Sequence, residues 1–196
     1  METLIDMVAA KAGRDPIDYR LELLKSGTKK EHERFANVIR VVRDFSGWEK
    51  SQRRGFAASY TFGTFLAVVA DVSVSEKEVH IDRMFVAVDC GTAINPDVIK
   101  AQIEGGIGYG LSAAIYSEIN FENGVVMESN FPNYETMRIN QMPKIDVKIV
   151  TSAEAPGGIG EPGTPIAAPA LINALYAKTG QRITTLPISK SGFIFV

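Results

Sequence analysis

The strongest constraint on the fold is a change in hydrophobic period near Gly55 of this 196-residue chain. Before it, apolar residues recur every three to four positions, a spacing that buries one face of a helix. This spacing predicts helices over about 1–12, 16–24 and 31–43, with a polar link over 25–30. Asp15-Pro16 is expected to start the second helix, with Asp15 as its cap and Pro16 at its first position. After it, runs rich in β-branched and aromatic residues predict strands over 56–62, 65–74 and 78–88. We therefore expect a helical N-terminal extension over 1–52 and an α+β domain over 53–196.

The second half of the chain predicts two long helices and further strands. Asn95 followed by Pro96 is a typical helix start, because Asn caps free N–H groups and Pro fits the first turn. Asn123-Gly124 indicates a tight hairpin turn. The expected elements are a helix from 95 to about 117, a hairpin within 119–127, strands over 145–151 and 182–186, and a helix over 166–178 that ends before Gly180. The expected fold is α+β, with an antiparallel-rich mixed sheet packed by two long helices.

Composition excludes several classes of function. The net charge of −2 gives no support for binding nucleic acid or an anionic membrane. The one cysteine, Cys90, excludes an internal disulfide, and His32 and His80 lack the spacing of a zinc site. The longest apolar run, 65–74, is interrupted by Asp71, so no membrane span is expected.

A glycine- and proline-rich loop from Ala155 to Pro165 contains a single carboxylate, Glu161. Glycine lets a backbone approach a ligand closely, and proline fixes the path of the chain. A helix follows directly, and its dipole favours the charged form of a carboxylate at its start. A positioned, ionised carboxylate suits a general base. The alternative is a plain structural turn with a solvated glutamate.

The helix expected from Asn95 carries an unusual number of glycines, at positions 105, 106, 108 and 110. Each glycine inside a helix costs about 1 kcal/mol relative to alanine. Gln102, Gly105, Gly106 and Tyr109 share one face, which places an amide beside a bare backbone groove. One interpretation is close packing against another element. The other is that Gln102 offers a donor and an acceptor to a planar, polar ligand in the groove.

Two residues that occur once each have structural interpretations. Cys90 has no histidine nearby in sequence to activate it, so burial in the core is favoured over a role as nucleophile. Trp48 is expected to anchor the helical extension to the sheet.

Three stretches in this order resemble one family: Val88-Asp-Cys-Gly-Thr-Ala-Ile-Asn-Pro-Asp97, Ala101-Gln-Ile-Glu-Gly-Gly-Ile107, and Gly158-Ile-Gly-Glu-Pro-Gly163 with Ala168-Pro-Ala-Leu-Ile-Asn-Ala174. They resemble the C-terminal part of the molybdopterin-binding subunit of the xanthine oxidase and aldehyde oxidase family, of the isoquinoline 1-oxidoreductase β-subunit type. Gly13-Arg-Asp-Pro-Ile-Asp-Tyr-Arg20 and Phe45-Ser-Gly-Trp48 fit that type too, so the resemblance covers nearly the whole chain.

The resemblance implies a molybdenum-dependent oxidoreductase that hydroxylates an aldehyde or an N-heterocycle with oxygen from water. The family's Gly-Glu-Pro glutamate acts as the base, and Glu161 matches it. The family's Gln-x-Glu-Gly glutamine contacts the pterin, and Gln102 matches it. The same motifs imply cofactor contacts at Gly105, Gly106, Gly158 and Gly160. The implied cofactor is molybdopterin, in its cytosine dinucleotide form, carrying molybdenum without a protein side chain as metal ligand.

Subunits of this family are much longer and enclose the cofactor between two large domains. The resemblance therefore implies a fragment that is inactive alone, with the remaining domains of the molybdenum subunit and a small iron–sulfur subunit, which holds the 2Fe-2S clusters, as partners. Exposed apolar surface on such a fragment also predicts a homodimer. Related subunits are soluble and cytoplasmic or periplasmic.

Two other functions compete with this one. A truncated homologue acting as a non-catalytic assembly or interaction module would not need both Gln102 and Glu161. A nucleotide-binding domain is disfavoured, because no Lys-Ser or Lys-Thr follows the glycines of the 155–165 loop and no strand–GxGxxG–helix unit is present.

Overall fold

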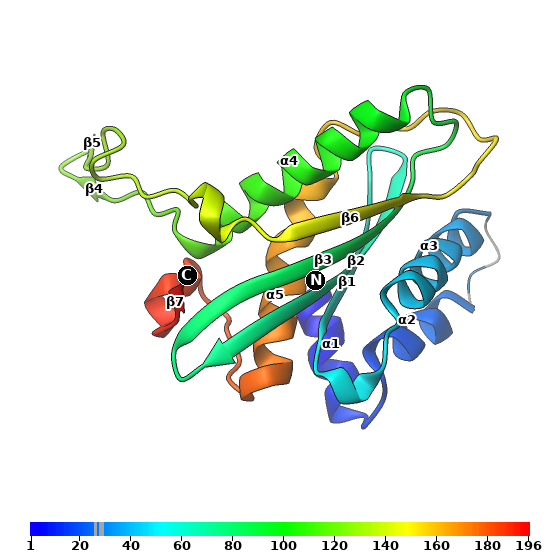
Figure 1. Ribbon diagram of the computed structural model, residues 1–196, viewed down its shortest axis with the longest axis horizontal. Coiled ribbons are helices and arrows are strands. Elements are labelled where there is room, and N and C mark those ends of the chain that lie inside the picture. The colour runs from blue at the N-terminus through cyan, green and yellow to red at the C-terminus, as the bar shows by residue number, and fades with distance from the viewer. Residues whose placement is uncertain (26, 28–29) are drawn as a thin grey trace.

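The computed structural model describes residues 1–25, 27 and 30–196 (Figure 1). Its longer helices are α1 (Glu2–Lys11), α2 (Pro16–Lys25), α3 (Lys30–Ser46), α4 (Pro96–Ile115) and α5 (Gly163–Thr179). Its strands are β1 (Gly55–Thr61), β2 (Thr64–Ser75), β3 (Glu78–Asp89), β4 (Phe121–Glu122), β5 (Val125–Val126), β6 (Lys144–Ile149) and β7 (Ile194–Phe195). Short 3₁₀ turns are η1 (Lys50–Gln52), η2 (Ile139–Gln141) and η3 (Ile188–Ser191). Residues 26, 28 and 29 of the expected polar link lie outside the described residues.

The main sheet is mixed, in the order β1-β2-β3-β6. Strands β1, β2 and β3 form an antiparallel meander, and both β6 and β7 pair with β3 in parallel. The α+β fold class expected from the sequence, with an antiparallel-rich mixed sheet, is confirmed.

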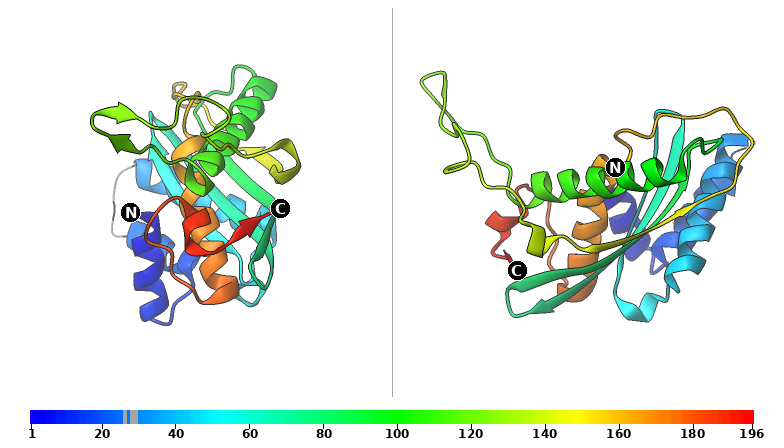
Figure 2. Two further views of the ribbon diagram at one scale, coloured as in Figure 1. Left: turned by 90° about the vertical axis from the view of Figure 1, so that its left-hand side faces the viewer. Right: turned by 45° about the horizontal axis from the view of Figure 1, so that its top comes forward.

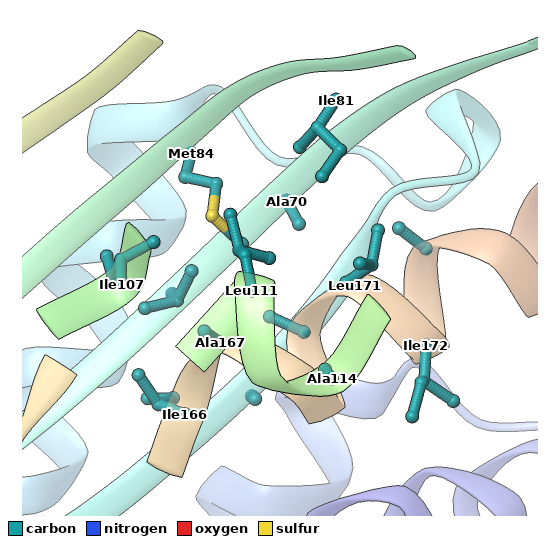
Figure 3. Packing of buried hydrophobic residues seen from close by; sticks show 14 of the residues in the cluster. Ala70, Ile81, Met84, Ile107, Leu111, Ala114, Ile166, Ala167, Leu171 and Ile172 are labelled. Carbon is teal, nitrogen blue, oxygen red and sulfur yellow. The ribbon is translucent and has the colours of Figure 1, made fainter. Parts of the chain in front are cut away.

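The sheet is covered on both faces, giving three layers (Figure 1). On one face, α4 and α5 contribute Ile107, Leu111 and Ile166 to a core that includes Met84 of β3 (Figure 3). On the other face, α2 and α3 contribute a second buried cluster with Phe56 and residues of β2 and β3. Because both faces are covered, the first seven residues of β2 are all buried, which explains the unbroken apolar run from Phe65 to Ala70.

Asp15 and Trp48 tie the N-terminal helices to the sheet. Asp15 Oδ1 accepts hydrogen bonds from the N–H groups of Ile17, at 2.8 Å, and Asp18, at 3.1 Å, so it caps α2 as expected. Asp15 Oδ2 accepts from Trp48 Nε1 at 2.9 Å, and the indole packs edge-on against Phe56 of β1. The expected role of Trp48 as an anchor is confirmed by these contacts.

A buried ionic cluster lies against the edge strand β1 of the main sheet. Arg20, only 4% exposed, donates to the carboxylates of Glu2 and Asp6 at 3.0 Å each. Glu2 Oε2 also accepts from the Ala58 N–H of β1 at 2.8 Å. Since β1 is an edge strand, this carboxylate satisfies a backbone donor that would otherwise be open to another chain.

The strand expected over 182–186 is wrong. Strand β6 occupies the edge of β3 from Arg83 to Val88, so only the first residues of β3 remain free on that side. There Glu78 and Val79 pair with Ile194 and Phe195, which form β7. Ile183 is buried in the core without a place in this sheet.

The expected hairpin within 119–127 is confirmed as β4 and β5. Asn123 and Gly124 have φ of 51° and 81°, the positive values that a two-residue turn of this kind requires. The hairpin extends away from the sheet and helices in each view (Figures 1 and 2).

Candidate functional site

Three turns meet at one end of the main sheet: the β1–β2 turn, the segment after β3, and the glycine-rich loop before α5 (Figure 1). The Gly157 N–H donates to the Cys90 carbonyl at 2.8 Å, and the Gly158 N–H donates to the Phe62 carbonyl at 2.8 Å. Thr64 Oγ1 donates to the Gly158 carbonyl at 2.7 Å. These three hydrogen bonds fix the path of the loop that leads to Glu161.

Glycine is required at Gly157 because the loop passes directly over the β1–β2 turn. A Cβ on Gly157 would lie 2.7 Å from Thr64 Oγ1 and 2.8 Å from the backbone of Gly63. Gly158 is equally constrained, since its Cβ would lie 2.8 Å from the Cβ of Phe62. Gly158, expected as a cofactor contact, therefore has a packing role in the position of the loop.

Gly105, Gly106 and Gly110 of α4 differ in how closely other atoms approach them. A Cβ on Gly106 would lie 3.3 Å from Gly163 Cα, and one on Gly110 would lie 2.3 Å from the Thr164 carbonyl oxygen. These two glycines let the backbones of α4 and α5 touch where the helices cross. Gly105 is not packed in this way, because a Cβ there would have no atom within 4 Å. Close packing therefore explains Gly106 and Gly110 but leaves Gly105 unexplained.

The structure brings Gln102 and the loop of Glu161 together. Gln102 Nε2 donates to the Gly160 carbonyl at 3.4 Å, a long hydrogen bond that joins α4 to the residue before Glu161. The side chains of both Gln102 and Glu161 are exposed. The Glu161 carbonyl accepts from the Thr164 N–H at 2.9 Å, which places the acid just before the first turn of α5.

An ion pair that the sequence did not reveal supports this end of the sheet. Arg34 of α3 donates to both oxygens of Asp89, at 2.9 and 2.7 Å, and Asp89 Oδ1 also accepts from the Gly91 N–H at 3.0 Å. Burial alone would raise the pKa of Asp89, but the bonds from Arg34 and Gly91 hold it below its ordinary value. The pair therefore keeps Asp89 ionised and fixes the turn that follows β3.

Cys90 is buried, as expected for a packing residue. Burial is the main cause of a raised pKa for its thiol, which disfavours the nucleophilic thiolate. Its backbone carbonyl, which accepts from Gly157, contributes to the site instead.

A groove lies beside α4, along the side of Gly105 and Tyr109. It has a volume of about 460 Å³, and its walls include Gly105, Tyr109, Arg138, Ile139 and Met142. Of the four residues expected to share one face of this helix, Gly105 and the 78% exposed Tyr109 line the groove, whereas Gln102 and Gly106 do not. The segment over 136–142 forms the opposite wall and carried no recognisable motif.

No cluster of three or more His, Cys, Asp or Glu side chains suited to a metal ion occurs within residues 1–25, 27 and 30–196. Over the same residues, no helix is long and apolar enough to cross a membrane.

Comparison with known proteins identifies the family of this chain. Residues 8–143 match the molybdopterin cofactor-binding domain family. The chain is 34% identical to the isoquinoline 1-oxidoreductase subunit beta of Brevundimonas diminuta over 95% of its own length and 24% of that subunit. It is 30% identical to a membrane-bound aldehyde dehydrogenase [pyrroloquinoline-quinone] of Gluconacetobacter polyoxogenes over 96% of its length and 27% of that protein. It thus spans about a quarter of the length of these relatives.

A solved structure supports the fold. The structure of quinoline 2-oxidoreductase from Pseudomonas putida 86 superposes with a TM-score of 0.54 over 64% of this chain and 17% of that chain, at 24% identity. The family match includes Gln102 but ends before Glu161.

Proposed function

This chain belongs to the molybdopterin cofactor-binding domain family, as its sequence motifs suggested, and from that membership we propose that it forms part of the cofactor site of a molybdenum hydroxylase. The observation that carries the proposal is the contact between Gln102 and Gly160, which joins two separate motifs beside Glu161. A scaffold would have no reason to bring this amide and this acid together on an exposed surface.

The residues at the site suit a pterin cofactor. Gly105 leaves open a space that a Cβ would fill, and it lies one helical turn from Gln102. Gln102 Oε1 accepts no hydrogen bond from the described residues, so it remains free to accept one from a ligand.

When bound, the cofactor would supply the redox chemistry by which a water-derived oxygen enters the substrate. The role we assign to Glu161 is to accept the proton from that oxygen, since its carboxylate is exposed and its backbone is fixed by the loop and by Thr164. The role we assign to Gln102 is to orient the pterin with its free amide groups, beside the bare backbone of Gly105. Gly160 would contribute its backbone, and Gly106 and Gly158 would act through the close packing that shapes the site.

The finer identity of the system is also part of the proposal. The substrate would be an aldehyde or an N-heterocycle, and the cofactor the cytosine dinucleotide form of molybdopterin. We propose that residues 53–196 form the cofactor-binding unit and that residues 1–52 are a helical extension covering the far face of its sheet.

The partners would be the remaining domains of the molybdenum subunit and a small iron–sulfur subunit carrying 2Fe-2S clusters, and the chain would be inactive without them. Exposed Ile94, Val98 and Tyr109, at the start of α4 and along it, provide apolar surface that a partner would cover. Two isolated copies would bury the same surface as a homodimer.

A cofactor analysis tests this function most directly. Molybdenum and pterin should be absent from the isolated chain and present at about one equivalent in the complex assembled in its native cells. Molybdenum in neither preparation would favour an assembly or interaction module. Pyrroloquinoline quinone in place of the pterin would refute the cofactor assignment, and its absorption spectrum and mass distinguish it.

The assembled complex also permits a test of the acid. Glu161→Gln keeps the size of the side chain but removes its basicity, so turnover should fall by a factor of about 100 to 10,000 while molybdenum stays bound. Glu154→Gln is the matched control, because Glu154 is a carboxylate of the same segment but precedes the glycine-rich part. Unchanged turnover in Glu161→Gln would remove that residue from the role of base.

A further inference from the structure

We propose that residues 117–135, the arm, are a docking element for a second polypeptide whose surface is an apolar recess bordered by lysine and arginine side chains. The arm contains β4 and β5 and extends from the body of the molecule (Figures 1 and 2). It is separate from the surface around Gln102 and Glu161, and the proposal does not depend on a bound cofactor.

The arm presents an unusual set of exposed apolar side chains. Phe121 is 68% exposed and Phe131 is 79% exposed, values that are high for phenylalanine. The other exposed apolar residues of the arm are Ile119, Val125, Val126 and Met127. Phe121 pairs directly with Val126 across the hairpin, so these two side chains lie together on one face. Val125 pairs with Glu122 and faces the other side of the hairpin. Exposed apolar side chains gathered on one projecting segment are typical of an interaction site.

The arm is held in a defined shape without contributing to the core. Glu128 accepts from both the backbone and the side chain of Asn120, at 2.7 Å each. Asn133 Oδ1 accepts from the Ser129 N–H at 3.0 Å, and Asn133 Nδ2 donates to the Met127 carbonyl at 2.7 Å. A two-stranded hairpin is only marginally stable in water. These polar bonds therefore fix the shape of a segment whose apolar side chains are left outside.

Charge indicates the chemistry of the partner. Residues 117–135 include four glutamates, Glu118, Glu122, Glu128 and Glu135, and no lysine or arginine. Glu118 pairs with Lys190 of the body, whereas Glu122 and Glu135 form no ion pair with any described residue. A surface that receives the arm would therefore combine apolar contact for Phe121 and Val126 with cations for these two free carboxylates.

The same charge argues against two other occupants. Two copies of the arm packed together would bring eight carboxylates into one interface, since each copy supplies four, and like charges in contact oppose association. An anionic lipid surface would repel the arm for the same reason.

The test is a pair of photo-crosslinkers in the complex purified from native cells. A benzoylphenylalanine in place of Phe121 should crosslink to one surface of a second polypeptide that contains apolar residues flanked by lysine or arginine. The same group in place of Leu4, an exposed apolar residue of α1, is the control and should not reach that surface. Crosslinks from position 121 to another copy of this chain would overturn the proposal.

Substituted variants make the test quantitative. Phe121→Asp with Val126→Asp should reduce retention of the crosslinked partner about tenfold or more, because the buried centre of an interface supplies most of its affinity. Glu122→Lys with Glu135→Lys should weaken retention and reduce its dependence on salt. Leu4→Asp should leave retention unchanged, and circular dichroism should show that each variant is folded.

Two further outcomes would refute the proposal. Retention that is unchanged in both arm variants would show that the arm does not contact the partner. Flotation of the wild-type chain with phosphatidylcholine and phosphatidylglycerol vesicles, lost in Phe121→Asp with Val126→Asp, would identify a lipid surface as the occupant instead.

Discussion

Arg34 and Asp89 form a two-pronged ion pair that links helix α3 to the end of β3, across 55 positions of sequence. The carboxylate is almost fully buried and the guanidinium is mostly buried. Asp89 also orients Gly91, whose neighbour Cys90 accepts a backbone bond from the glycine-rich loop. One ion pair thus connects the N-terminal helices with the candidate cofactor site.

Replacement of Asp89 should therefore destabilise the whole chain. Asp89→Asn leaves the charge of Arg34 without a partner, and breaking a buried pair in this way costs about 3–5 kcal/mol. Glu33→Gln, which removes the exposed pair with Arg40, should cost no more than about 1 kcal/mol. Urea unfolding followed by circular dichroism measures both changes. Equal effects in the two variants would contradict the structural role of Asp89.

The same pair predicts how stability depends on pH. The pKa of Asp89 is lower in the folded chain than in the unfolded chain, where it should be about 3.9. Its contribution is therefore fully present above about pH 4 and is lost as the pH falls through the folded value. Unfolding midpoints at pH 7, 4 and 3 should show that the wild type and Asp89→Asn converge as the pH falls. A constant difference across this range would rule out Asp89 as a source of the pH dependence.

Asp15 combines two functions in one side chain, so its loss should be seen in two signals. Asp15→Ala removes the cap of α2 and the acceptor of the Trp48 indole N–H. The lost cap alone costs about 1 kcal/mol. Because Trp48 is the only tryptophan, its fluorescence should shift to the red as the indole gains access to water. Asp15→Asn keeps one acceptor oxygen, which is enough to cap α2, but its amide NH2 group cannot accept from the indole N–H. This variant should therefore keep most of the stability while its fluorescence still shifts to the red.

The sequence predicted the elements that depend on local chemistry. Asp15-Pro16, Asn95-Pro96 and Asn123-Gly124 each specify a helix start or a turn within a few residues, and the structure confirms all three. Asn95, for example, accepts from the Val98 N–H at 3.1 Å through its side chain. The change of period at Gly55 likewise separated the helical segment from the sheet, because each period reflects one kind of secondary structure.

Features that depend on the meeting of distant segments were not predictable. Nothing near Arg34 in sequence indicates Asp89 as its partner, and nothing in 182–186 shows that β6 already occupies the edge of β3. The glycines of α4 look alike in sequence, yet only contact with Thr164 distinguishes Gly110 from Gly105. The sequence identified Gln102 and Glu161, but it did not show that residues 136–142 would line a groove along Gly105 and Tyr109.

Gly110 offers a direct test of the crossing between α4 and α5. In a free helix, alanine is favoured over glycine by about 1 kcal/mol. In Gly110→Ala, however, the new Cβ would lie 2.3 Å from the Thr164 backbone oxygen, so the helices must separate. Overpacking of this kind costs about 1–3 kcal/mol, and the variant should unfold at lower urea concentration than the wild type. A gain in stability would show that the helices do not cross this closely.

Gly105 differs from Gly110 because no atom would obstruct a side chain there. One substitution at this position therefore tests both the stability of α4 and the proposed cofactor site. Gly105→Ala meets no atom within 4 Å, so it should raise the free energy of unfolding by about 0.5–1 kcal/mol. If the bare backbone at Gly105 accommodates the pterin beside Gln102, the same methyl group should reduce the molybdenum retained by the assembled complex. Molybdenum per chain and the unfolding midpoint are measured on one preparation. A variant that is more stable and keeps its full molybdenum would exclude Gly105 from the cofactor site. Greater stability with less molybdenum would show that this glycine serves cofactor binding and lowers the stability of the helix.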